Sequence, residues 1–353
     1  MKFESGLSVA CEPLNLARLV HQHQEGGPRF IGEAQAQYQS RYRTIGPRTL
    51  QHVNSAHIPN APRIVDRYRN TVFCAQYSPD GEMFVTASQD RKVRIYNANT
   101  WKLAKAITTR DMGWAVLSTD FSPNTQWIAY SGWDTHVHLV NTAGDHEVHE
   151  ALEVVPDALA RARVALFSVK FSADSREILA GAKDNHFYLY DIETKRTTHA
   201  VEAHSDDINN VAWADQTSNV FFTGSDDHLI KVWDRRILGN GNKPAGVLPG
   251  HLHGITYIDS RGDGRYLISN GKDQRIKLWD LRSMADGDSP ENDPPSRLHG
   301  MMDYRMGIPS QRYLHRRLDN DRSIMTYRGH QVAETLIRCK FSPASTGHRY
   351  IYT

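Results

Sequence analysis

Short runs in which apolar and polar residues alternate recur along the chain, and turn residues such as Gly, Pro, Asn, Asp and Ser separate them. The clearest runs lie between residues 203 and 282. There, two similar segments each combine a His, an alternating run, a turn, a second run and a closing Trp-Asp. Alternation with a period of two is typical of half-buried β-strands, and turn residues between such runs predict antiparallel hairpins. We therefore expect consecutive short strands.

The same pattern recurs at a nearly fixed interval. In each unit an Asp lies six residues before the aromatic or apolar residue that closes the unit, and the successive Asp residues are 44, 50, 43 and 46 positions apart. The Asp residues are Asp90, Asp134, Asp184, Asp227 and Asp273, and the closing residues are Tyr96, Val140, Tyr190, Trp233 and Trp279. This self-similarity predicts a repeat protein. We expect units that end near residues 97, 141, 191, 234 and 280.

Two dipeptides mark the strongest units. Gly-His occurs at Gly250-His251 and Gly329-His330, with a degenerate Ala203-His204, and Trp-Asp occurs at Trp233-Asp234 and Trp279-Asp280. These dipeptides resemble the signature of the WD-repeat family of β-propellers, whose units of about 40–45 residues form four strands per blade. The resemblance implies an all-β propeller, with about seven blades in a full-length protein. A propeller of this size is one closed architecture, although length alone would predict two domains.

In that family a His, the turn Asp, a strand Ser or Thr and the closing Trp form a hydrogen-bonded tetrad. The resemblance implies such a structural tetrad in the two strong units, through His204, Asp227 and Trp233, and through His251, Asp273 and Trp279. Buried polar side chains are tolerated when they satisfy one another, so a tetrad would make a blade rigid. The first three units keep the turn Asp but lack a clear Gly-His, and the resemblance does not give them a full tetrad.

We divide the chain into an N-terminal arm, residues 1–70, and a propeller, residues 71–353. Within the arm, PLNLARLV predicts a short amphipathic helix, and an Arg-rich lead-in follows. This lead-in has two interpretations: a solvated segment that lies over the propeller, or an arm that docks a partner or nucleic acid.

The propeller region contains an acidic loop between Asn141 and Ala165, an insertion over residues 283–328, and an incomplete unit over 329–353. The chain stops where the second strand of that last unit is expected. An unfinished blade would expose strand edges, so we expect a longer form of the protein that completes this blade and adds another.

Composition excludes several classes of protein. The net charge of +2 gives no bulk electrostatic reason to bind nucleic acid. Cys11, Cys74 and Cys339 are odd in number and far apart, which fits a reducing compartment and provides no disulfide or metal framework. No apolar run of signal-peptide type opens the chain, and no stretch is long enough to span a membrane. We expect a soluble intracellular protein.

We find no motif for catalysis or for a cofactor. There is no G-x-S-x-G elbow and no phosphate-binding G-x-x-x-x-G-K-[ST], and the repeat accounts for most of the His and Asp residues. His136 and His138 would lie on one face of a strand, but no third metal ligand is evident. The sequence favours exposed polar residues on that strand, no metal, no cofactor and no enzymatic activity.

Arg236 and Arg282 each lie two residues beyond a Trp-Asp. This motif resembles that of WD-repeat substrate receptors of cullin-4 ubiquitin ligases, in which such an Arg docks on the damaged-DNA-binding adaptor subunit. A guanidinium past a strand end can present a planar fork to carboxylates or carbonyls of a partner. The alternative is that both Arg residues pair with acids of neighbouring blades.

Longer phrases, such as GHLHGITYIDSRGDGRYLISNGKDQRIKLWDLR, extend the resemblance to these receptors over roughly residues 50–353. It implies a non-catalytic substrate-recognition subunit of a cullin-4 RING ubiquitin ligase in the nucleus and cytoplasm. Such a subunit bridges the adaptor to proteins destined for proteasomal degradation, including a stress-response transcription factor. The implied adaptor site comprises Arg236, Arg282, Trp233, Asp234, Trp279 and Asp280, and Leu14, Leu16 and Leu19 could form a helix that enters the adaptor.

A second hypothesis is a general WD-repeat interaction scaffold, associated with histones or RNA and unconnected to ubiquitin. Nucleic-acid binding would require a basic channel mouth with aromatic residues. The segment from Arg305 to Arg322 could supply the charge. Steep weakening by salt would distinguish phosphate binding from an adaptor interface with an apolar core.

Overall fold

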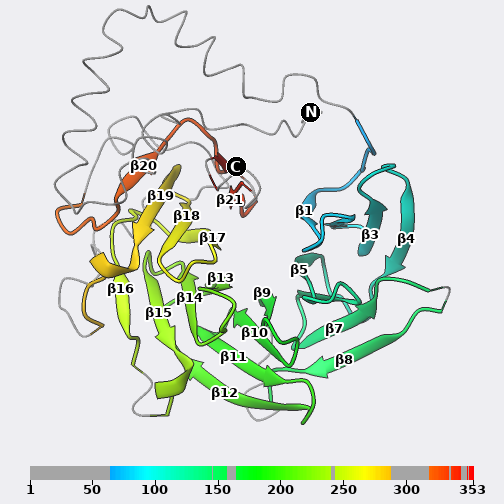
Figure 1. Cartoon of the computed structure of the whole chain (residues 1–353), viewed down its shortest axis with the longest axis horizontal. Helices are drawn as coiled ribbons and strands as arrows, with labels where there is room; N and C mark the ends of the chain where they lie inside the picture. The colour runs from blue at the N-terminus through cyan, green and yellow to red at the C-terminus, as the bar shows by residue number, and fades with distance from the viewer. Residues whose placement is uncertain are drawn as a thin grey trace, which may run out of the picture.

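A computed structural model describes residues 64–144, 146–156, 164–239, 243–287, 318–333, 335–342, 348 and 350–353. Over these residues the chain forms five four-stranded antiparallel sheets and one two-stranded sheet, with short 3₁₀ turns but no α-helix. The sheets follow one another around a centre like the blades of a propeller (Figure 1). The all-β propeller that the sequence predicts is therefore confirmed.

Each blade is a meander of four consecutive strands. Blade one contains β1 (Val72–Tyr77), β2 (Met83–Ser88), β3 (Lys92–Asn97) and β4 (Leu103–Thr108); blade two contains β5 (Val116–Phe121), β6 (Trp127–Gly132), β7 (His136–Asn141) and β8 (His149–Glu153). Blade three contains β9 (Leu166–Phe171), β10 (Glu177–Ala182), β11 (His186–Asp191) and β12 (Arg196–Glu202). Blade four contains β13 (Ile208–Trp213), β14 (Val220–Ser225), β15 (Ile230–Asp234) and β16 (Gly246–Leu248); blade five contains β17 (Ile255–Ser260), β18 (Tyr266–Gly271), β19 (Arg275–Asp280) and β20 (Met325–Tyr327).

The third strands end at residues 97, 141, 191, 234 and 280, where the sequence units were placed. In blades two and five, the fourth strand lies in a stretch that the sequence did not predict to be a strand. β8 lies within the expected acidic loop after Asn141, and β20 lies within the expected insertion over 283–328. β20 pairs with β19, so the chain returns to complete blade five after residues that lie outside the described part. Neither strand was recognised because each is short and follows an interruption of the repeat.

Apolar residues pack between blades as well as within them. One cluster joins Val85 and Ile95 of blade one to Ile128 and Val140 of blade two, and similar clusters join each later pair of blades. Burial of apolar area between neighbours is the expected source of stability in a repeat array, because one sheet cannot cover its own faces. The first strands of neighbouring blades lie side by side toward the centre (Figure 1).

A clamp built on one Asp joins the first strands of some neighbouring blades. Asp120 of β5 accepts hydrogen bonds from Lys170 Nζ at 2.6 Å and from the backbone N–H of Phe171 at 3.0 Å, both in β9. Asp259 of β17 accepts the equivalent pair from Lys340 Nζ at 2.7 Å and Phe341 N–H at 2.9 Å. Both clamps tie a first strand to the corresponding strand of the next unit.

The residues after blade five begin a sixth unit. β21 (Lys340–Phe341) pairs with β22 (Ile351–Tyr352), and Cys339 packs against Tyr257, Ile268 and Ile276 of blade five. Arg338 donates to Leu117 O at 3.0 Å and contacts Cys74 Sγ at 3.0 Å, so this unit also touches blades one and two. In Figure 1, β21 lies between blades five and one.

Because strands alternate in direction, each blade has two distinct ends. We call one the start face: the first strands begin there, and the turns at Asp90, Asp134, Asp184, Asp227 and Asp273 lie on it. We call the other the end face: the first and third strands both finish there, and the third strands finish at residues 97, 141, 191, 234 and 280. Residues that precede a first strand and residues that follow a third strand therefore lie on opposite faces.

Several sequence predictions fall outside the described residues. They are the amphipathic helix with Leu14, Leu16 and Leu19, nearly all of the Arg-rich lead-in, and the Arg residues from Arg305 to Arg317. Among the described residues, no helix is long and apolar enough to cross a membrane.

Candidate functional site

The two strong units bring together the residues of the implied tetrads. In blade four, His204 Nδ1 lies 2.7 Å from Asp227 Oδ2 and His204 Nε2 lies 2.6 Å from Thr223 Oγ1, while Trp233 Nε1 donates to Thr223 at 2.9 Å. In blade five, His251 contacts Asp273 at 3.0 Å and Ser269 at 2.7 Å, and Trp279 Nε1 donates to Ser269 at 2.8 Å. Each network connects the loop before a blade to its second and third strands.

Burial makes these networks sensitive to the loss of one member. The carboxyl group of Asp273 is buried, which opposes its ionisation, but His251 and Arg275 and the N–H of Leu252 outweigh burial and lower the pKa of Asp273 to about 2. Burial lowers the pKa of His204, and Asp227 opposes that effect. Removal of one partner would leave buried polar groups unsatisfied, which costs about 1–3 kcal/mol per group.

The first three blades satisfy the turn Asp in other ways. The residue four positions later on the third strand bonds to it: Arg94 to Asp90, His138 to Asp134, and Tyr188 to Asp184. In blade one, Tyr68 takes a position like that of the tetrad His, because its hydroxyl contacts Thr86 at 2.9 Å and Tyr96 of the third strand. Tyr96 in turn donates to Asp66 at 2.6 Å. Both Asp66 and Tyr68 precede the first predicted unit and were therefore missed, although Tyr68 lies 22 positions before Asp90, as His251 does before Asp273.

Arg236 and Arg282 occupy equivalent turns on the end face. Each Trp-Asp ends a third strand, and a 3₁₀ turn follows, Arg235–Ile237 in blade four and Leu281–Ser283 in blade five. The Asp side chain caps the turn by accepting from the Arg backbone N–H at 3.0 Å in both blades. The guanidinium groups also pair with these Asp residues, Arg236 with Asp234 at 2.6 Å and Arg282 with Asp280 at 2.7 Å.

Both Arg side chains remain open to solvent. Arg236 is 64% exposed and Arg282 is 69% exposed, and each folds back on its own Asp rather than reaching an acid of a neighbouring blade. Arg235 shows the contrasting arrangement, because its guanidinium pairs with Glu177 of blade three. The two adjacent blades therefore present the same pair of side chains, an Arg supported by an Asp, in the same turn.

The remaining residues of the implied adaptor site differ in whether a partner could reach them. Trp233 and Trp279 are buried and their indole N–H groups are engaged in the tetrads, so neither can contact an adaptor directly. Their role at this face would be to hold the turn in place. Asp280 is also buried and is shared between Arg282 and Arg265, whereas Asp234 is partly exposed.

His138 is buried, and the expectation of an exposed strand residue is wrong for it. His136 and His138 do point to the same side, and both contact Asp134, at 3.2 and 3.1 Å. The pKa of Asp134 is lowered to about 2, because the hydrogen bonds from both His residues outweigh the effect of burial. Within the described part of the chain, no group of three or more His, Cys, Asp or Glu residues could hold a metal ion.

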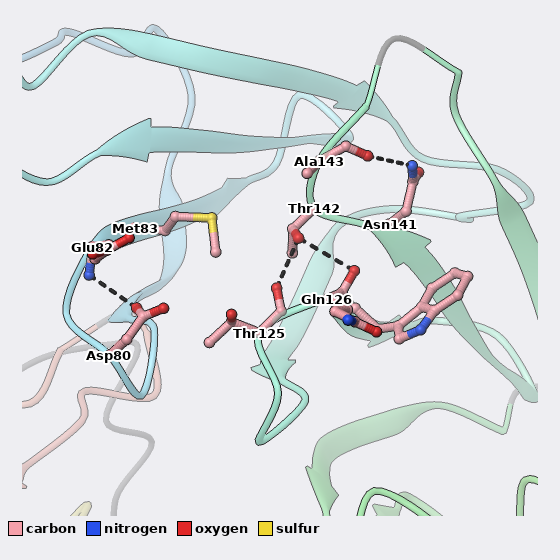
Figure 2. A pocket seen from close by; sticks show the side chains of 9 residues that line it. Asp80, Glu82, Met83, Thr125, Gln126, Asn141, Thr142 and Ala143 are labelled. Atoms are coloured by element: carbon pink, nitrogen blue, oxygen red, sulfur yellow. Dashed lines mark hydrogen bonds between the residues drawn. The ribbon is translucent and has the colours of Figure 1, made fainter.

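A cleft of about 460 Å³ opens on the end face between blades one and two. Asp80 and Met83 of blade one and Thr125 and Asn141 of blade two are among the residues that line it (Figure 2). The polar groups around this cleft bond to one another: Thr142 Oγ1 donates to Thr125 O at 2.7 Å, and Asp80 accepts from Glu82 N–H at 2.9 Å (Figure 2). The cleft is thus a gap between turns, without a set of polar groups directed at a ligand.

Comparisons with known proteins agree with the repeat and with the fold. The chain matches the family model described as "Nucleolar protein 10-like, N-terminal domain", a β-propeller, over residues 55–249, and the "WD domain, G-beta repeat" model over residues 242–280. The chain belongs to this family of WD-repeat β-propellers. The first match covers more than half of the chain and includes the units that lack Trp-Asp.

Individual relatives support the narrower resemblance to cullin-4-associated receptors. The chain is 42% identical over 314 residues to the LEC14B homolog of Prunus armeniaca, covering 86% of this chain and 65% of that protein. It is 39% identical over 321 residues to the DDB1- and CUL4-associated factor 11 homolog of Caenorhabditis elegans, covering 87% of this chain and 56% of that protein. The propeller chain thus spans less than two thirds of each relative's length, and the resemblance found in the sequence is confirmed.

Proposed function

We propose that this propeller is the substrate-recognition part of a cullin-4 ubiquitin ligase and docks on the adaptor, DDB1, through Arg236 and Arg282. The observation that carries the proposal is the similarity, over most of this chain, to proteins named DDB1- and CUL4-associated factor 11 homolog. In this role the chain has no catalytic step of its own. It would bind the adaptor at one site and a protein substrate at another, so that the ligase ubiquitylates the substrate and the proteasome degrades it.

The end face supports the choice of docking residues. Arg236 and Arg282 lie in matching turns of neighbouring blades, and both side chains are exposed. Asp234 and Asp280 hold each guanidinium in a fixed orientation, which reduces the entropy lost on binding. An Arg restrained in this way can still donate hydrogen bonds to carboxylates or carbonyls of a partner.

Co-precipitation of DDB1 with variants of the chain tests this assignment. We expect the wild-type chain to capture DDB1 and the Arg236→Ala/Arg282→Ala variant to lose it, with an unchanged melting temperature. Arg176→Ala/Arg196→Ala is the matched control, because these exposed Arg residues also lie on the end face, in blade three. Equal loss of DDB1 capture in the control variant, or a lower melting temperature of the Arg236→Ala/Arg282→Ala variant, would contradict docking through these two residues.

A second candidate is a scaffold associated with RNA. The family model carries the description nucleolar protein 10-like, and a more distant relative, 30% identical over 118 residues, is the Poly(A)+ RNA export protein of Schizosaccharomyces pombe. Failure of a folded wild-type chain to capture DDB1, together with salt-sensitive binding of poly(A), would favour the scaffold.

A further inference from the structure

The start face carries an uninterrupted row of aromatic side chains from blade one to blade three. Phe73 and Trp114 have ring centroids 5.4 Å apart, Trp114 and Trp133 6.3 Å, and Trp133 and Phe167 6.1 Å, all in edge-to-face contacts. Trp114 is 47% exposed and the other three rings are half-buried. We call these four residues the aromatic row.

A charged group borders the aromatic row at blade three. Lys183 Nζ lies 4.9 Å from the centre of the Trp133 ring, which is a cation–π contact. Beyond Lys183, three half-buried carboxylates, Asp206, Asp207 and Asp226, lie on the start face of blade four. Asp226 pairs with Lys272 at 2.6 Å and accepts from Asn209 Nδ2 at 2.6 Å.

Asp207 differs from Asp226. No described residue donates a hydrogen bond to its carboxylate or forms an ion pair with it, although Asp206 and Asp226 are close enough to repel it. Burial first, and then these two neighbouring acids, raise the pKa of Asp207 to about 6, while Lys183 and Lys272 act in the opposite direction. A carboxylate in this environment gains from a new positive partner, which a ligand could provide.

We propose that the start face binds an extended protein segment that places an apolar side chain on the aromatic row and a Lys or Arg beside Asp207. The inference rests on the proposed function in that it treats this segment as part of a substrate. Clustered aromatic rings that remain partly exposed mark interaction sites, and their π faces attract cations as well as apolar groups. About five extended residues would span the row.

The chemistry favours a protein segment with basic residues over nucleic acid. Aromatic rings would stack on bases as readily as on side chains, but three adjacent carboxylates would repel phosphates. The same carboxylates would attract a Lys or Arg. The start face also lies opposite Arg236 and Arg282, so a segment bound here leaves the proposed adaptor site uncovered.

Fluorescence anisotropy with labelled ten-residue peptides tests the inference. The first peptide alternates Lys with Leu and Phe, the second has Glu in place of Lys, and the third has Ser in place of Leu and Phe. We expect the first to bind the wild-type chain at least tenfold more tightly than the others. We also expect Trp114→Ala and Asp207→Asn each to weaken its binding at least tenfold.

Matched variants on the end face provide the controls. Trp101→Ala removes an aromatic side chain that also makes edge contacts, with Tyr77 and Phe84, and Glu193→Gln removes an exposed carboxylate. Neither should change peptide affinity. Asp207→Asn should melt no lower than the wild type, because the ionised Asp207 does not contribute to folding in its present environment.

Three results would overturn the inference: no binding of the first peptide, equal binding of the Glu peptide, or equal losses in the controls. A ten-nucleotide oligouridine that binds more tightly than the first peptide, and that loses its binding in Trp114→Ala, would also contradict the inference. The aromatic row would then be a site for single-stranded nucleic acid. The proposed function has a separate readout, because Trp114→Ala and Asp207→Asn should still capture DDB1. If these variants lose peptide binding but still capture DDB1, the result bears on the start face alone and leaves the proposed function unaffected.

Discussion

At the residue scale, the same polar position of a blade is filled in different ways. His204 and His251 occupy it in blades four and five, and the hydroxyl of Tyr68 occupies it in blade one. All three connect the segment before a blade to its second strand. The common requirement is a polar side chain that satisfies the buried Thr or Ser, and the identity of that side chain can vary.

Asp273→Ala should destabilise the propeller by about 1–3 kcal/mol, because it leaves His251 and the N–H of Leu252 buried without their acceptor. Urea unfolding followed by Trp fluorescence measures the change. Asp90→Ala should cost less, since Asp90 is partly exposed and its main partner is Arg94. Equal costs for the two variants would contradict the account of the tetrad.

His330 should make stability depend on pH. Burial lowers its pKa to about 4, and its Nδ1 has no partner in the described part of the chain, whereas Nε2 contacts Asn270 Oδ1 at 2.8 Å. The unfolded chain takes up this proton near pH 6.5 and the folded chain only near pH 4. The free energy of unfolding should therefore fall between pH 6.5 and 4, by up to about 3 kcal/mol.

Urea unfolding at several pH values checks this dependence. His330→Gln should reduce the slope of the curve over that range, because Gln does not titrate, while His204 with its lowered pKa still contributes. His199→Gln, at a more exposed His of β12, is the control and should keep the slope of the wild type. A curve for His330→Gln that matches the wild type would contradict the assignment.

At the scale of elements, stability depends on contacts between blades. Asp120 is the acceptor that ties β5 to Lys170 and Phe171 of β9. Asp120→Ala should lower the free energy of unfolding by about 1–3 kcal/mol, because it leaves the Phe171 N–H without an acceptor and Lys170 without its ion pair. Glu193→Ala, at an exposed turn, should change it by less than about 0.5 kcal/mol. If the free energy of unfolding of Asp120→Ala equals that of the wild type, the clamp is not a source of stability.

The sequence predicted the strands that follow the repeat and missed those that do not. Alternating runs and the turn Asp identified the first three strands of each blade, because these positions recur at a fixed interval. β8 and β20 are fourth strands in stretches of unequal length, so no periodicity identifies them. The tetrad residues were readable from Gly-His and Trp-Asp, but no motif marked Arg94 and His138 as the partners of Asp90 and Asp134, although each lies only four positions further along the chain.

The two proposed binding sites also differ in whether the sequence alone identifies them. Arg236 and Arg282 stand at fixed distances from a motif, so the sequence alone identifies them. The aromatic row could not be predicted, because its four residues come from three units and only Phe73 and Phe167 share a repeat position, the second residue of a first strand. Only the packing of blades one, two and three against one another places them side by side.

At the scale of the whole molecule, the two proposed binding sites lie on opposite faces of the propeller. Arg236 and Arg282 lie on the end face, where the third strands of blades four and five finish, and the aromatic row and Asp207 lie on the start face. A subunit that bridges two proteins must bind both at once, and sites on opposite faces allow this without overlap. The proposed sites should therefore be independent in their binding energies.

The most direct measurement is the dissociation constant of purified DDB1 for three proteins: the wild-type chain, Arg236→Ala/Arg282→Ala, and Trp114→Ala/Asp207→Asn. We predict that the wild type and the Trp114/Asp207 variant bind DDB1 equally, and that the Arg236/Arg282 variant binds at least tenfold more weakly while it remains folded. Undiminished binding by the Arg236/Arg282 variant, or no binding by a folded wild type, would contradict the account.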